Sequence, residues 1–142
     1  MSDEPLNAPM GSYFGEVIST YTRAQALVDG VLLDADPASR EAGFRWPVAL
    51  TAAAWSDCVE WTEDDSVRQS HQDLSGRLWD VLYMAFHAIR TSIKSSDTLQ
   101  FELYRVPRDG RSMEAELVTL KLIVGPGDRG EPVITLLLPD ED

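Results

Sequence analysis

Apolar residues recur every three or four positions along the segment from Leu74 to about Lys94. The members of this series are Leu74, Leu78, Leu82, Ala85, Ile89 and Ile93. On an α-helix, residues at this spacing share one face, so they form a continuous apolar stripe that is expected to be buried. The pattern predicts a long helix that is the main core element of the protein.

The C-terminal third of the chain shows patterns typical of β-strands. Residues 98–106 alternate between polar and apolar side chains, and residues 117–124 and 133–138 are rich in Leu, Val and Ile. Turn residues separate the three segments, at Pro107–Gly110 and in the octapeptide GPGDRGEP of residues 125–132. Consecutive strands joined by short turns predict an antiparallel three-stranded meander.

Shorter elements are predicted in the N-terminal half, where Gly, Pro and capping residues bound them. They are a helix capped within Ser19–Thr22 and ended by Gly30, a strand at Val31–Leu33, a helix from Asp36–Pro37 to Gly43, a helix that starts at Pro47, and a polar loop over Thr62–Asp73. The helix at Pro47 is based on the helical spacing of Val48, Ala52, Trp55 and Val59.

The order of these elements predicts the fold class. Helices and one short strand come first and three strands follow, which favours an α+β fold with helices packed on a C-terminal antiparallel meander. The whole chain, residues 1–142, is expected to form a single domain. Residues 1–12 are expected to be a flexible arm, and residues 139–142 an acidic tail.

The octapeptide GPGDRGEP has the two glycines of a phosphate-binding loop but not its other residues. Such a loop needs Lys after the second glycine and then Ser or Thr, and this chain has Glu131 and Pro132 there. The segment that follows is β-branched and apolar, whereas a phosphate site needs a helix N-terminus. The octapeptide is therefore interpreted as a hairpin turn.

Charge narrows the range of binding partners. The chain has 12 basic and 24 acidic residues and a net charge of −12. Direct binding to nucleic acid or to an anionic membrane requires a basic surface, so neither is expected. No apolar run approaches the roughly 20 residues that span a bilayer, and we expect a cytoplasmic protein.

Candidate catalytic residues do not form a recognisable set. Cys58, the single cysteine, lies between Asp57 and Glu60, whose charges disfavour a thiolate, so its pairing with His71 is electrostatically awkward. His87 and Asp80 are two helical turns apart, too far for a hydrogen bond. We predict no catalytic residue, no cofactor and no metal site.

The acidic residues are the most informative chemical feature. Five of them, Asp57, Glu60, Glu63, Asp64 and Asp65, lie within nine positions that contain no Lys or Arg. One interpretation is solubility, which a large net charge favours. The other is an anionic surface that imitates the phosphate backbone of DNA and binds a basic protein, with Trp61 as a partly exposed apolar anchor.

Four segments together resemble a family of small bacterial proteins of unknown function that are encoded on plasmids, integrated elements and prophages. They are YTRAQALVDGVLLD, REAGFRWPVALTAAAW, GRLWDVLYM and GPGDRGEPVITLLLPDED. The GPGD–GEPV hairpin and the LPDED ending are the most recognisable parts. The resemblance implies an accessory protein of a mobile element, and it implies no catalytic residues.

Together these observations lead to one main functional hypothesis and two alternatives. The main hypothesis is a non-enzymatic protein that binds and modulates a basic, nucleic-acid-handling partner, such as a host defence complex, through residues Asp57–Asp65. The first alternative is a small enzyme or ligand-binding domain with a cleft near His87 and Asp80. The second is a structural homo-oligomer formed through a sheet edge.

Overall fold

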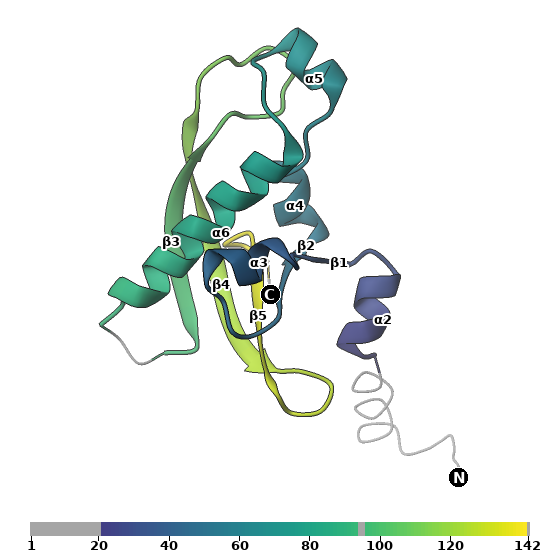
Figure 1. Ribbon diagram of the computed structural model, residues 1–142, viewed down its shortest axis with the longest axis vertical. Coiled ribbons are helices and arrows are strands. Elements are labelled where there is room, and N and C mark those ends of the chain that lie inside the picture. The colour runs from purple at the N-terminus through teal and green to yellow at the C-terminus, as the bar shows by residue number, and fades with distance from the viewer. Residues whose placement is uncertain (1–20, 94–95, 142) are drawn as a thin grey trace.

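The computed structural model describes residues 21–93 and 96–141 of the chain and has an α+β fold (Figure 1). A five-stranded mixed sheet lies behind the long helix α6. The predicted arm of residues 1–12, Lys94 at the predicted end of the long helix, and Asp142 lie outside the described residues. The α+β class predicted from the order of the elements is confirmed.

The helices and strands alternate irregularly in the first half of the chain and give way to strands in the second. The elements are α2 Arg23–Val28, β1 Leu32–Asp34, α3 Ala38–Ala42, β2 Val48–Thr51, α4 Ala52–Cys58, α5 Glu63–Arg68, α6 Leu74–Thr91, β3 Thr98–Arg105, β4 Glu116–Pro126 and β5 Pro132–Leu137.

The sheet contains more than the predicted meander. Its strand order is β1-β2-β5-β4-β3, and β3, β4 and β5 pair antiparallel with their sequence neighbours, as predicted. The prediction of one additional short strand was wrong, because both β1 and β2 join the sheet. Strand β2 pairs parallel with β5 and antiparallel with β1, so the sheet is mixed.

The helix predicted from Pro47 is a strand followed by a helix. Residues Val48–Thr51 form β2, and Thr51 then caps α4, accepting a hydrogen bond from the backbone N–H of Ala54 at 3.1 Å. Residues 48–50 are all buried, because β2 lies between two neighbouring strands and both its faces are covered. A strand buried on both faces has no polar alternation, and a short apolar run of this kind cannot be told from a helix by period.

The predicted polar loop of residues 62–73 also contains a helix. Thr62 and Asp65 form a capping box at the start of α5, in which each side chain accepts the other residue's backbone N–H. Asp65 occupies the position where Glu or Gln is usual in this motif. Helix α5 and the β3–β4 connection together form the upper end of the molecule in Figure 1.

Helix α6 supplies one side of the core, as its apolar stripe predicts. Its buried residues Leu78, Val81, Leu82 and Ala85 pack against side chains that alternate along the strands, such as Leu120 and Leu122 on β4. The N-cap of the helix is Asp73, whose carboxylate accepts the N–H of Gly76 at 2.7 Å. Toward the end of α6 the stripe emerges from the core, since Ile89 is 37% exposed. The helix ends at Thr91, so the last predicted stripe residue, Ile93, lies beyond it and is 98% exposed.

The octapeptide GPGDRGEP is a hairpin turn between β4 and β5, as predicted, with Gly130 at a φ of 82°. It also holds a distant helix. The Asp128 carboxylate accepts the backbone N–H groups of Arg23, at 2.7 Å, and Ala24, at 3.0 Å. These are the first two residues of α2, whose N–H groups have no partner within the helix.

The acidic C-terminal segment is anchored to the sheet. The Glu141 side chain accepts hydrogen bonds from the Thr51 hydroxyl, at 2.6 Å, and from the Leu138 backbone N–H, at 2.9 Å. Its carbonyl accepts a hydrogen bond from Lys121 Nζ at 2.5 Å. The LPDE part of the ending therefore closes one end of the sheet.

Candidate functional site

The five acidic residues of the predicted binding surface are divided among α4, the connection after it, and α5. Most of their carboxylates have a partner within the protein. Asp57 pairs with Arg105 at 3.1 Å, Glu60 accepts the indole N–H of Trp55 at 3.0 Å, and Asp64 pairs with Arg68 at 3.0 Å. Glu63 and Asp64 are exposed, so within this set they are the residues most accessible to a partner.

Asp65 has a structural role in the interior. It is 3% exposed, and its carboxylate accepts a hydrogen bond from Arg108 Nε at 2.6 Å in addition to the bonds from Thr62. Burial acts to raise the pKa of Asp65, but the hydrogen bonds from Arg108 and Thr62 outweigh it and lower the pKa below its usual range. The residue joins α5 to the β3–β4 connection.

Trp61 is not the partly exposed anchor that its position in the sequence predicts. Its ring is 5% exposed, and its indole N–H donates to the Ser66 hydroxyl at 3.0 Å. The guanidinium of Arg77 lies over the ring, 4.5 Å from its centroid. The aromatic ring therefore binds a cation of its own chain.

Arg77 and Gln69 hold the β3–β4 connection against the helices. Arg77 is buried and donates hydrogen bonds to the carbonyls of Val59, at 3.2 Å, and Val106, at 3.0 Å. The Gln69 amide donates to the carbonyls of Pro107, at 2.8 Å, and Ser112, at 2.7 Å. The upper end of the molecule is thus built from buried polar contacts.

Cys58 is a buried thiol in α4. Burial and the neighbouring carboxylate of Asp57 raise the pKa of Cys58 to about 12. The thiol is therefore protonated at neutral pH, and a protonated thiol is a poor nucleophile. His71, its candidate partner in the sequence, is exposed in the connection before α6, whereas the thiol is buried.

The two residues of the predicted cleft line different depressions of the surface. Asp80 lines the groove toward β3 described below, and His87 lines smaller depressions on either side of the second half of α6. Within residues 21–93 and 96–141, no three His, Cys, Asp or Glu side chains are close enough to hold a metal ion together.

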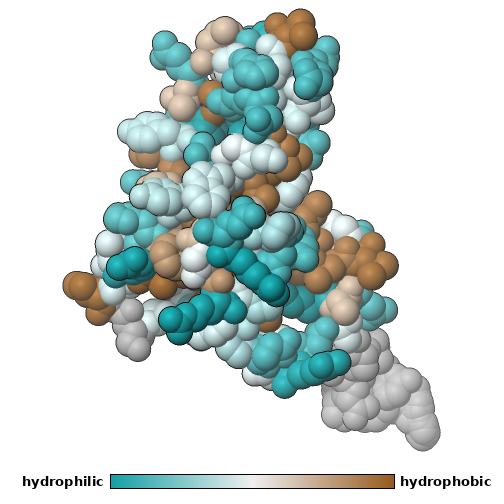
Figure 2. Space-filling view, in the orientation of Figure 1, coloured by the Kyte–Doolittle hydropathy of each residue, from teal (hydrophilic) through white to brown (hydrophobic). Residues whose placement is uncertain are grey.

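A groove between α6 and β3 combines carboxylates with exposed aromatic rings. We call it the α6–β3 groove; it has a volume of about 470 Å³ and is lined by Asp80, Tyr83, Met84, Glu102, Leu103, Tyr104 and Leu117. Tyr104 is 67% exposed, and Tyr83 and Leu117 are also exposed. Figure 2 shows one face of the molecule, where apolar groups occur in separate clusters among hydrophilic side chains.

The charged side chains in the lining of the α6–β3 groove are both acidic. Within residues 21–93 and 96–141 they are Asp80 and Glu102, and neither carboxylate has an ion-pair or hydrogen-bond partner there. Partial burial raises the pKa of Asp80, and Arg77 opposes part of this rise. Partial burial thus disfavours the charged form of Asp80, although the residue is exposed, and a cation brought to the groove would favour that form.

Sequence reasoning missed this groove because its residues are dispersed. Asp80 and Tyr83 come from α6, Glu102 and Tyr104 from β3, and Leu117 from β4. One feature of the sequence could have indicated it: the polar side of β3 carries an aromatic ring. On this strand Thr98, Gln100, Glu102 and Tyr104 alternate with more buried residues.

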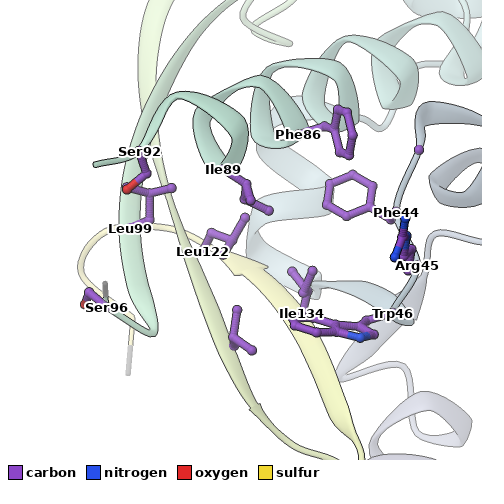
Figure 3. Close-up of a pocket in the computed structure, with 12 residues that line it drawn as sticks. Phe44, Arg45, Trp46, Phe86, Ile89, Ser92, Ser96, Leu99, Leu122 and Ile134 are labelled. Atoms are coloured by element: carbon purple, nitrogen blue, oxygen red, sulfur yellow. The ribbon is translucent and has the colours of Figure 1, made fainter. Parts of the chain in front are cut away.

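A second depression, the apolar pocket, lies between the end of α6, the connection from α3 to β2, and the sheet (Figure 3). Its volume is about 410 Å³. Its lining is Gly43, Phe44, Arg45, Trp46, Phe86, Ile89, Ser92, Ser96, Leu99, Leu122, Val124 and Ile134. Phe44 and Phe86 pack edge to face at 5.4 Å, and Figure 3 shows Ile89 and Ile134 directed toward the same space.

Comparison with known proteins assigns a family but no activity. The model of a Family of unknown function (DUF6573) matches residues 10–142. No curated protein and no solved structure matches this chain. The comparisons therefore provide no enzyme relative. Among the described helices, none is long and apolar enough to cross a membrane.

Proposed function

The chain belongs to the DUF6573 family of unknown function, and we propose that it is a non-enzymatic binding protein whose α6–β3 groove receives a basic segment of a partner protein. The observation that carries the proposal is the combination of two unpaired carboxylates with exposed aromatic rings in one groove. A basic side chain is the group that matches both features.

The chemistry of the groove favours Arg over other side chains. The Arg guanidinium forms hydrogen-bonded ion pairs with carboxylates and stacks on aromatic faces. Asp80 and Glu102 provide the carboxylates, while Tyr83 and Tyr104 provide the rings. Tyr and Arg are also the residue types over-represented among binding hot spots, where exposed rings become buried.

The position of β3 favours an extended partner segment. Strand β3 is at the end of the sheet order and, in the described residues, pairs only with β4. Its outer edge therefore presents backbone N–H and C=O groups that an added strand can bond, and side chains of such a strand would lie beside Glu102 and Tyr104.

We propose that the partner is a nucleic-acid-handling protein, because such proteins present the basic surfaces that complement an acidic groove. The net charge of −12 would accelerate association with such a surface by long-range attraction. In this proposal Glu63 and Asp64 contribute to attraction, while Asp57, Glu60 and Asp65 mainly stabilise the fold. A role as an accessory protein of a mobile element that inhibits such a partner is part of the same proposal.

A peptide titration followed by backbone amide chemical shifts in NMR tests the proposal with a defined probe in place of the natural partner. The probe is a short peptide that alternates Arg and Val, compared with a peptide that alternates Glu and Val. We expect the Arg peptide alone to bind, with its largest shifts in β3 and in the first half of α6.

Matched variants make this test specific to the groove. Glu102→Gln combined with Tyr104→Ala should weaken binding of the Arg peptide by at least about fivefold, since it removes a charge and a ring from the lining of the groove. The control is Glu41→Gln combined with Tyr21→Ala, which changes an exposed carboxylate on α3 and an exposed ring before α2. The proposal would be refuted if both variants lost the same affinity for the Arg peptide, or if the amide chemical-shift changes were centred outside β3 and α6.

A further inference from the structure

The apolar pocket is a second site, separate from the α6–β3 groove, and it differs from the groove in chemistry. Its walls are the rings of Phe44, Trp46 and Phe86 and the aliphatic side chains of the sheet, whereas the groove is acidic. Among the described residues, the two depressions share no lining residue. Its volume of about 410 Å³ falls in the range of about 300–1,000 Å³ that is typical of small-molecule sites.

Backbone hydrogen bonds fix both ends of the segment of residues 43–47, which forms one wall of the pocket. At one end of the wall formed by residues 43–47, the N–H groups of Gly43 and Phe44 donate to the carbonyls of Arg40, at 3.1 Å, and Ser39, at 3.0 Å. At the other end, the Pro47 carbonyl accepts the N–H of Ile134 at 2.9 Å. A wall fixed at both ends favours a preformed pocket. Less conformational entropy is then lost when a ligand binds.

Gly43 allows this wall to approach α6 closely. Its φ is 115°, and a Cβ atom at this position would lie 2.9 Å from Cζ of Phe86. Only glycine combines this backbone conformation with this contact. The position of the Phe86 ring in the pocket wall therefore depends on the absence of a side chain at residue 43.

Apolar surface in the pocket remains exposed to water although the core lies directly behind it. Trp46 is 46% exposed and Ile89 is 37% exposed, while Leu122 and Ile134 at the base of the pocket are buried. Covering such surface would contribute about 25 cal/mol per Å². The pocket thus offers a favourable site for an apolar group.

Arg45 indicates the polar part of the ligand. Within residues 21–93 and 96–141 it is the only charged residue in the lining, and its exposed side chain makes no ion pair or hydrogen bond there. Figure 3 shows it at the margin of the pocket, between the rings of Phe44 and Trp46. In a chain with twice as many acidic as basic residues, a guanidinium without a carboxylate partner is available to an anion.

From these observations we infer that the apolar pocket binds a small amphipathic anion, whose apolar body lies against Phe86, Ile89 and Ile134 and whose carboxylate or sulfonate pairs with Arg45. The inference does not depend on partner binding. A small molecule suits the enclosure by α6, the 43–47 wall and the sheet, while an acidic partner protein would be repelled by the overall charge of −12.

Displacement of a fluorescent probe tests the inference. The probe is 1-anilinonaphthalene-8-sulfonate, an aromatic sulfonate, and the competitors are decanoate and decanol, which share a chain length and differ in charge. We expect the probe to bind the folded protein at one site. The inhibition constant of decanoate should be at least tenfold lower than that of decanol, because only decanoate pairs with Arg45.

Three variants assign the effect to the pocket. Ile89→Asp should abolish probe binding by placing a carboxylate in the apolar wall, and Ile93→Asp is its matched control, because Ile93 is 98% exposed and lies outside the lining. Arg45→Gln should remove the preference for decanoate while decanol binding remains. Thermal unfolding of each variant verifies that it is folded.

Either of two results would overturn the inference. One is probe binding that Ile89→Asp and Ile93→Asp leave equally strong, which would place the probe elsewhere. The other is equal competition by decanoate and decanol in the unmodified protein. This result would show that an anionic group on the ligand does not contribute to binding. Since neither measurement involves a basic peptide, their failure would not affect the proposed partner binding.

Discussion

Arg77 is the residue that joins the helical part of the protein to the β3–β4 connection. Its guanidinium contacts the ring of Trp61 and two backbone carbonyls, and burial lowers the pKa of Arg77 below its ordinary value. A buried cation is costly unless its donors are bonded, and these contacts provide most of that compensation. Asp65 acts in a comparable way at α5, through Arg108 and Thr62.

Replacement of Arg77 by Ala should therefore destabilise the protein strongly. We expect a loss of about 2–4 kcal/mol, because the change removes charged hydrogen bonds and leaves two buried carbonyls without a donor. Arg111→Ala, which changes an exposed side chain, should cost less than about 0.5 kcal/mol. Urea unfolding of both variants measures the difference. Similar midpoints would contradict the structural role of Arg77.

The thiol of Cys58 should be unreactive in the folded protein. Because its pKa is raised to about 12, the folded thiol stays protonated well above pH 8, whereas an unfolded cysteine ionises near pH 8.5. Iodoacetamide at pH 8 should leave the native protein unmodified and label it in urea. Rapid native labelling would contradict this.

The raised pKa of Cys58 also makes the free energy of unfolding depend on pH. A raised pKa in the folded state means that the stability associated with the neutral thiol is complete below about pH 8.5 and is lost as the pH rises toward 12. The destabilisation caused by Cys58→Ala, measured by urea unfolding, should therefore be smaller at pH 10 than at pH 7.

At the scale of elements, contacts between distant segments decide what individual motifs do. The hairpin of residues 125–132 is a turn, as its glycines and the following strand predict, yet its Asp128 also caps α2 across more than a hundred positions of sequence. The turn therefore contacts the start of α2, whose N-cap is Thr22. Arg23 adds bonds to Thr135 and to the Ile134 carbonyl of β5.

Loss of this cap gives a specific prediction. Asp128→Ala should reduce the stability of α2 or of the whole protein by about 0.5–2 kcal/mol, the usual effect of removing a helix cap. Arg129→Ala in the same turn should cost less than about 0.5 kcal/mol, because only its backbone N–H makes a described hydrogen bond, to Glu131 at 2.8 Å. Amide hydrogen exchange of residues 25–28 measures the local effect, and equal protection in both variants would contradict the capping role.

Elements with a regular spacing of apolar residues or with a clear helix-capping residue could be predicted from the sequence. Helix α6, strands β3–β5, and the stops at Gly30 and Gly43 are of this kind. Strand β2 could not be recognised, because its burial on both faces removes the alternation of a strand and leaves Val48 at helical spacing from Ala52. Helix α5 was missed because its six residues are all polar except Val67, so no apolar stripe marks it.

At the scale of the whole molecule, the arrangement of strands determines where binding can occur. Insertion of β5 between β2 and β4 closes the centre of the sheet and leaves β3 at an edge beside α6. No local pattern predicts this arrangement, since β2 and β5 are more than eighty positions apart. The charge pattern of the sequence indicates a basic partner and places its site on residues Asp57–Asp65. In the structure, the carboxylates of Asp57, Glu60 and Asp65 bind other side chains of the protein.

The central claim is that a basic partner protein binds the α6–β3 groove, and recovery of that partner from the native host tests it most directly. Three tagged proteins are compared by quantitative mass spectrometry: the unmodified chain, Glu102→Gln with Tyr104→Ala, and Glu41→Gln with Tyr21→Ala. We predict one stoichiometric partner with a basic surface, retained by the unmodified chain and by the Glu41 and Tyr21 variant and lost from the groove variant. Equal recovery with both variants, or a partner without a basic surface, would contradict the claim.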